Sequence, residues 1–146
     1  MSFGNKLHDF AKKTGGKLDD VARDVVINIG KSVVEMSPVG DPDLWVSKPP
    51  PGYVGGRFRA NWQHGFGSTA SGTLDEIDAS GGVSLANIQA GVDSNPAAGI
   101  HFISNNLPYA QRLENGYSSQ APAGMVGLTV IKFKDIVNIS VQKVKS

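Results

Sequence analysis

Three histidines, His8, His64 and His101, are the side chains best suited to acid–base or metal chemistry near neutral pH. None has a second ligand type at the three- or four-residue spacing that places two side chains on one helix face. His64 and His101 also lie in stretches that resemble strands, among apolar neighbours. We therefore interpret the histidines as core or interface residues rather than catalytic or metal-binding groups.

The carboxylates form no evident catalytic or calcium-binding set. Asp75, Glu76 and Asp78 share a Gly-, Ser- and Thr-rich loop that lacks the alternating oxygen ligands and closing Glu of a calcium site, so we expect a solvated acidic loop. Glu114 has no second carboxylate nearby for glycosidase-like catalysis. Arg112 would lie on a different face of the same helix, so each of these two side chains would contact a separate neighbour.

Nucleotide and thiol chemistry also lack support. The stretch Gly52–Gly56 is glycine-rich, but Arg57 and Phe58 follow it where a phosphate-binding loop needs Lys and then Ser or Thr. The chain has no cysteine, which excludes disulfides, thiolate zinc sites, iron–sulfur clusters and a cysteine nucleophile. The sequence therefore predicts a protein that is not an enzyme and that has no cofactor and no metal.

Size and charge indicate one domain whose partners are recognised by local surfaces. The 146 residues carry 14 basic and 13 acidic side chains, and the net charge is +1. Only residues 132–146 are clearly basic, with four bases against one acid. No run of about twenty apolar residues is present, so we expect no membrane association. Residues 1–13 carry charges where a secretory signal needs an apolar run, so we expect no targeting signal.

The first long element that the pattern predicts is a helix that Pro38 ends. Its apolar positions recur at three- and four-residue steps: Val21, Val25 or Val26, Ile29, Val33 and Met36. Ahead of it, Phe3, Leu7 and Phe10 share another helical face, and Gly15 and Gly16 follow them. Residues 1–16 are thus either a separate short helix or a hinged extension.

Residues 38–56 are rich in Pro and Gly and predict an extended arm. A structureless loop of this length in a small domain usually has a function. Trp45 and Tyr53 would contact another molecule or fold back onto the domain, and the sequence leaves both alternatives open.

The middle of the chain predicts two strands and a short helix. Residues 57–66 alternate, with Phe58, Ala60, Trp62, His64 and Phe66 on one side and Arg57, Arg59, Asn61 and Gln63 on the other. Residues 68–82 predict a loop or weak strand, residues 84–92 a short helix and residues 99–104 a second strand.

Two further helices are predicted near the C-terminus. Residues 105–116 carry Asn106 as N-cap, Pro108 in the first turn, an inner face of Leu107, Ala110 and Leu113, and Gly116 as the stop. From Val126 to Val144 the apolar residues keep a helical period, although their β-branched character leaves a strand as the alternative for the last third. Together, these elements predict an α+β fold, with a small antiparallel or mixed sheet flanked by an N-terminal and a C-terminal helix and with a long Pro/Gly-rich arm.

Three blocks of this sequence resemble the tail-completion, or neck, family of tailed bacteriophages. They are Ser37–Pro38 followed by the arm, the stretch GGRFRANWQ at residues 55–63, and the stretch ISNNLPYAQRLENGYSSQAPAGMV at residues 103–126. The resemblance covers residues 21–135. It implies a non-enzymatic virion protein, assembled in the bacterial host cytoplasm, that forms a homo-oligomeric ring, usually of six subunits, and joins the tail to the head connector.

The implied partners are other copies of the chain, a tail terminator or tail tube protein and a head connector or stopper protein, with DNA only as passing cargo. On this basis we expect a set of protein-interface residues: Trp45, Tyr53, Arg57, Arg59, Trp62, Tyr109, Arg112, Glu114 and Gln120. The alternative is an adaptor that contacts DNA through its basic C-terminal segment, with Lys132, Lys134, Lys143 and Lys145. In the predicted strand, the Trp62 indole would lie on the face opposite to Arg57 and Arg59. This argues against binding of single-stranded nucleic acid at these residues.

Overall fold

The computed structural model describes residues 17–39, 55–116, 120–121 and 123–145. The described chain is α+β, with six helices and one two-stranded antiparallel sheet. In order, the elements are α2 (Leu18–Met36), α3 (Arg57–Ala60), β1 (Trp62–Phe66), α4 (Gly82–Asp93), β2 (His101–Asn105), α5 (Ala110–Glu114), α6 (Val126–Ile131) and α7 (Phe133–Lys145).

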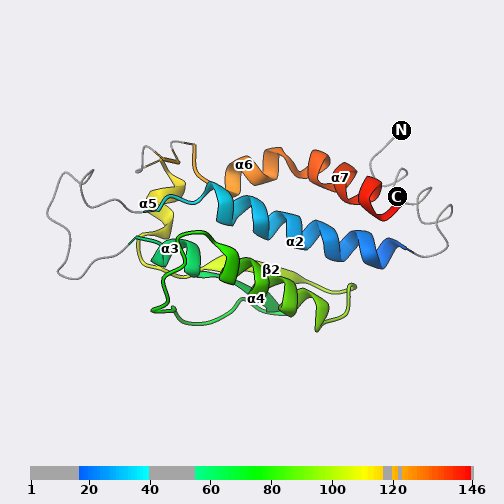
Figure 1. The fold of residues 1–146 in the computed structure, drawn as a ribbon, viewed down its shortest axis with the longest axis horizontal. Helices are drawn as coiled ribbons and strands as arrows, with labels where there is room; N and C mark the ends of the chain where they lie inside the picture. Colours follow the sequence, from blue (N-terminus) through cyan, green and yellow to red (C-terminus); the bar gives the residue numbers. More distant parts are fainter. Residues whose placement is uncertain (1–16, 40–54, 117–119, 122, 146) are drawn as a thin grey trace, which may run out of the picture.

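Helix α2 forms the middle of the molecule. It contacts α4 and both strands on one side and α6 and α7 on the other, so these elements make up three layers (Figure 1). Residues far apart in sequence therefore meet on α2. The helix predicted ahead of Pro38 is confirmed as α2. The negative charges of Asp19 and Asp20 in its first turn interact favourably with the positive end of the helix dipole. At its other end Ser37 is extended, with ψ at 136°, and Pro38 follows.

The two strands pair in antiparallel register, with Trp62 opposite Asn105 and Phe66 opposite His101. The second strand lies at residues 101–105, close to the predicted range of 99–104. The prediction of one strand over residues 57–66 is wrong in its first half, because Arg57–Ala60 forms a helical turn. Buried Asn61 ends this turn by bonding back to the carbonyl of Arg57 at 2.7 Å.

The short helix predicted at residues 84–92 is confirmed as α4, but the one predicted at 105–116 is shorter than expected. Asn106 does not cap it, because its amide donates to the carbonyls of Ala70 and Gly72 in the preceding loop. Helix α5 begins only after Pro108. Gly116, with φ at 86°, follows the end of the helix as predicted.

The last helical stretch is divided in two at Lys132, which has φ −83° and ψ 1°. The strand alternative for its final third is wrong, because α7 extends to Lys145. The predicted apolar stripe is buried only in part. Val137 is buried, whereas Val130 and Phe133 keep 67% and 39% of their surface exposed.

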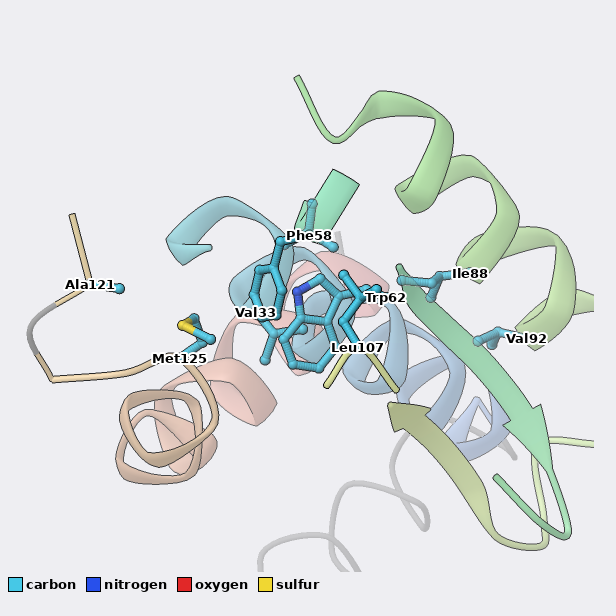
Figure 2. Packing of buried hydrophobic residues seen from close by; sticks show 9 residues of the cluster. Val33, Phe58, Trp62, Ile88, Val92, Leu107, Ala121 and Met125 are labelled. Carbon is cyan, nitrogen blue, oxygen red and sulfur yellow. The ribbon is translucent and has the colours of Figure 1, made fainter. Parts of the chain in front are cut away.

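A hydrophobic core joins α2 to β1, α3 and α4 and to the segments on either side of α5 (Figure 2). Trp62 lies at its centre, and its ring meets that of Phe58 edge to face at 5.8 Å between centroids. The fully or nearly fully buried members of the cluster are Val33, Val34, Phe58, Trp62, Ile88, Val92, Leu107, Ala121 and Met125. They come from α2, α3, β1, α4 and the segments around α5, so each of these elements depends on the others for burial.

Polar contacts fix α7 against α2. Asn28 donates from one amide nitrogen to Asp24 and to Ser140, each at 3.0 Å. Lys143 completes the set with an ion pair to Asp24 at 2.9 Å. Because Ser140 and Asp24 are buried, these bonds satisfy groups that water does not reach.

Candidate functional site

Residues of the sequence blocks that carry the family resemblance lie around Val39 and Gly55, the described residues on either side of segment 40–54. We call this region the arm base: Val39, the turn Gly55–Ala60, and Gln120. Gln120 pairs with Val39 in both directions, accepting from its N–H at 3.0 Å and donating to its carbonyl at 2.9 Å. A side-chain amide thus holds the chain as a neighbouring strand would.

Arg59 is the main tie within the arm base. Its guanidinium donates to the carbonyls of Glu35, Ser37 and Ala79 at 3.1, 2.9 and 2.8 Å. Two of these carbonyls lie at the C-terminal end of α2, where a cation is favourable to the helix dipole. Arg59 was expected at an interface, and in this structure these three bonds serve the chain's own fold.

Arg57 and Gly56 attach the arm base to the loop before α4. Arg57 donates to the carbonyl of Leu74 at 3.2 Å and pairs with exposed Asp75 at 3.4 Å, a contact that water screens. Gly56 has φ at 110°, and a Cβ there would stand 2.7 Å from the nitrogen of Ala79. The glycine therefore allows two backbone segments to approach closely.

Trp62 is a core residue in this structure. The residue is only 5% exposed, and its indole N–H donates to the hydroxyl of Ser37 at 2.7 Å. The expectation that Trp62 contacts a partner protein is therefore not met in the folded chain, because the core already covers the ring.

Glu114 caps the start of α6. Its two carboxylate oxygens accept the backbone N–H groups of Met125, Val126 and Gly127 at 2.9, 2.9 and 2.8 Å. Burial alone would raise the pKa of Glu114, but these three bonds outweigh burial and lower it. These bonds serve the chain's own fold, and the expected role of Glu114 at a junction between subunits stays a prediction.

Tyr109, Arg112 and Gln120 are expected interface residues that are exposed in the structure. Tyr109 is 36% exposed, and its ring lies 6.0 Å from that of Phe58. Arg112 is exposed on α5. Trp45 and Tyr53 lie outside the described residues.

His64 and His101 form a pair that their separation in the sequence concealed. The Nε2 atom of His64 lies 2.8 Å from Nδ1 of His101, whose own Nε2 lies 2.9 Å from the carbonyl of Pro96. A carbonyl only accepts, so His101 donates from Nε2 and accepts at Nδ1 when it is neutral. His64 then donates from Nε2. Burial first, and the charge of His101 second, lower the pKa of His64.

The acidic loop is only partly solvated. Asp75 and Glu76 are exposed, as expected, but Asp78 is buried and accepts the backbone N–H groups of Gly81 and Ser84 at 3.1 and 2.9 Å. Burial would raise the pKa of Asp78, but the bonds from Ser84, Ser80 and Gly81 lower it. The prediction of a solvated side chain is wrong for Asp78, which caps the start of α4.

An apolar groove between α2, the sheet and α6–α7 was not predicted from the sequence. It encloses about 380 Å³. Its lining residues come from all three layers: Ile29, Val33, Trp62, Ile103, Val126, Thr129, Val130 and Phe133. The sequence did contain a signal, since Val126, Val130 and Phe133 belong to the apolar stripe with a helical period that begins at Val126.

A second, smaller pocket of about 230 Å³ lies beside the arm base, next to Arg59 and Gln120. Among the described residues, no three His, Asp or Glu side chains gather as metal ligands, and no helix is both long and apolar enough to span a bilayer. Of the C-terminal lysines, Lys143 is paired with Asp24.

Comparison of the chain with protein-family models, with curated proteins and with solved structures finds no match. The functional argument therefore rests on the residues and on the geometry given above.

Proposed function

We propose that this chain is a structural protein of the neck of a tailed bacteriophage, which completes or caps the tail and joins it to the head connector as a homo-oligomeric ring of six subunits. One observation carries most of the argument. The two sequence blocks that resemble the family, residues 55–63 and 103–126, meet in space: Asn105 donates to the carbonyl of Phe58 at 2.9 Å, and the rings of Phe58 and Tyr109 are in contact.

The arm base supports a role for residues 38–56 as a contact arm. Gln120 holds Val39 at the start of the arm, and Arg59 ties the turn at its end to the end of α2. A segment whose two ends are fixed on a folded body can contact a neighbour at a lower cost in entropy than one with a free end. We propose that the arm, with Trp45 and Tyr53, contacts an adjacent subunit or an adjacent ring.

The outer face of α6–α7 is the second proposed contact surface. Ile131 and Ile139 are 80% and 62% exposed, and large apolar side chains that cluster at a surface favour protein contacts. A repeated contact of this surface with a different surface of the next copy would close a ring by rotation. DNA would pass through such a ring as cargo, without base-specific contacts.

The experiment that tests this function is electron microscopy of lysates from the parent phage after disruption of this gene. We expect DNA-filled heads and separate tails of full length, and restored joining when the intact gene is supplied from a plasmid. A plasmid that carries the Trp45→Ala/Tyr53→Ala gene should restore head–tail joining at least tenfold less well than the intact gene. The matched arm variant Ser47→Ala should restore it fully. Normal joined particles after disruption would contradict the proposal.

A further inference from the structure

The apolar groove is incomplete in the described chain. Val126, Val130 and Phe133 line it, yet they keep 44%, 67% and 39% of their surface exposed. An apolar partner that covers these side chains would remove their exposed surface from water, which is favourable. The groove thus has the dimensions and character of a site for apolar side chains.

The polar groups at the groove are already satisfied. The Thr129 hydroxyl bonds to Ser32 at 2.7 Å and to the carbonyl of Met125 at 2.8 Å, and the indole N–H of Trp62 bonds to Ser37. A polar ligand would find no unpaired side-chain group among the lining residues, all of which the structure describes. The occupant should therefore be apolar.

We propose that the N-terminal segment of the same chain docks along α2 and fills this groove with Phe3, while Leu7 and Phe10 contact the body nearer to Gly15. These three residues fall on one face of a helix. The segment joins α2 directly, so its docking requires no second molecule. The inference does not depend on the proposed phage function.

The length of the segment matches the position of the groove. Ile29 and Val33 lie about 16 and 22 Å along α2 from Leu18 at 1.5 Å per residue. If the chain turns back at Gly15–Gly16 and continues as a helix, the twelve residues from Gly15 to Phe3 span about 18 Å along α2. Phe3 would then lie level with the Ile29 end of the groove, and the bond between Thr129 and Ser32 places α6 one helical turn further along α2.

Cysteine cross-linking tests this arrangement cleanly, because the chain has no cysteine of its own. The test variant is Phe3→Cys/Val130→Cys, which keeps Leu7 and Phe10 as anchors. The control is Phe3→Cys/Val83→Cys: Val83 is 60% exposed at the start of α4, a helix that lies on the side of α2 away from α6 (Figure 1). Disulfides form only when the two Cα atoms approach within about 7 Å.

We expect the test variant to form a disulfide within one chain at least tenfold faster than the control, with migration as a monomer on non-reducing gels. A cross-linked dimer would overturn the proposal and assign the groove to the N-terminal segment of another copy. Equal rates in the two variants would overturn it as well, because the segment would then show no preference for the groove.

A second measurement covers the case in which Phe3→Cys weakens docking. We expect Phe3→Asp/Leu7→Asp to raise the fluorescence of a dye that binds exposed apolar surface by several-fold, because the groove would lose its cover. Asn5→Asp, on the opposite face of the same segment, is the control and should leave the fluorescence unchanged. An equal signal from both variants would contradict the proposal.

Discussion

Two carboxylates in this chain hold the starts of helices. Glu114 accepts three backbone N–H groups at α6, and Asp78 accepts two at α4. The first N–H groups of a helix have no partner inside the helix, so a carboxylate placed there supplies both hydrogen bonds and a favourable charge. In both cases the acid stands outside the helix that it stabilises.

Replacing Glu114 by Gln should therefore destabilise the isolated chain. We expect a loss of about 1 kcal/mol in the free energy of unfolding, because the amide accepts through one oxygen and carries no charge. Since the pKa of Glu114 is lowered on folding, its contribution is present above about pH 4.3 and is lost as the pH falls through the folded pKa. Urea unfolding of Glu114→Gln and wild type should differ at neutral pH and converge in acid.

Glu76→Gln is the matched control for this measurement, because Glu76 is exposed in the loop before α4. It should change the free energy of unfolding by less than about 0.5 kcal/mol at neutral pH. An effect of Glu114→Gln no larger than that of Glu76→Gln would show that the α6 cap contributes little.

Two glycines with the same positive φ allow the cost of backbone strain to be distinguished from the cost of steric crowding when each is replaced by Ala. Gly124 and Gly72 have φ values of 79° and 78°, but a Cβ at Gly124 would stand among the atoms of Glu114, whereas nothing lies within 4 Å of one at Gly72. We expect Gly72→Ala to cost about 1 to 2 kcal/mol from strain alone. Gly124→Ala should cost clearly more, as measured by urea unfolding, and equal costs would contradict this account of crowding.

At the scale of single residues, important side chains could be selected from the sequence, but their contacts could not be predicted from it. Arg59 and Glu114 were selected, but their partners lie 20 or more and 11 or more residues away, beyond the reach of local spacing. Trp62 was selected as an interface aromatic and is instead the centre of the core. An aromatic residue suits a core and an interface for the same physical reason, so its type alone cannot distinguish them.

At the scale of elements, the β1–β2 sheet carries a titratable pair. His64 lies on β1 and His101 on β2, and the bond between them requires at least one of the facing nitrogens to be unprotonated. The pair links the sheet to Pro96 and lies beside Gly91 of α4. Protonation would therefore weaken the packing of the sheet against α4.

The stability of the chain should fall as the pH drops from about 7.5 to about 5.5. The pKa of His64 is lowered on folding, so the unfolded chain binds more protons below about pH 6.5, and the stability present above that pH is lost as the pH falls toward the folded pKa. We expect His64→Gln to remove most of this dependence in urea unfolding. His8→Gln should keep it, and an unchanged slope in His64→Gln would refute the assignment.

Elements with one regular period were predicted correctly, and those that tertiary contacts reshape were not. The periodic run in α2 and the short helix α4 are both found. The alternation over residues 57–66 concealed a helical turn, because Asn61 bonds to the distant Leu74 as well as to Arg57. Likewise α5 begins late, because Asn106 bonds to a loop rather than to its own helix.

At the scale of the whole molecule, α2 separates a covered side from a partly uncovered one. The side toward α4 and the sheet is closed by core residues such as Ile88 and Val92, neither of which is exposed. The α6–α7 side leaves apolar side chains in the groove and on its outer face. This asymmetry is what a subunit needs if one side forms its own core and the other side meets further protein.

The outer face of α6–α7 provides the last prediction. Ile131→Asp/Ile139→Asp should leave the free energy of unfolding within about 0.5 kcal/mol of wild type, because both side chains are mostly exposed, at 80% and 62%. The same double variant should restore head–tail joining at least tenfold less well than the intact gene, because two charges would be buried in a contact between subunits.

The control for this prediction is Val83→Asp/Ile100→Asp, which adds the same charge at residues that are 60% and 65% exposed, in α4 and directly before β2. It should fold and restore joining as the intact gene does. Equal restoration by both double variants would remove α6–α7 from the ring contact. Failure of the Ile131 and Ile139 variant alone, with its stability unchanged, would identify this face as the surface on which neighbouring subunits meet.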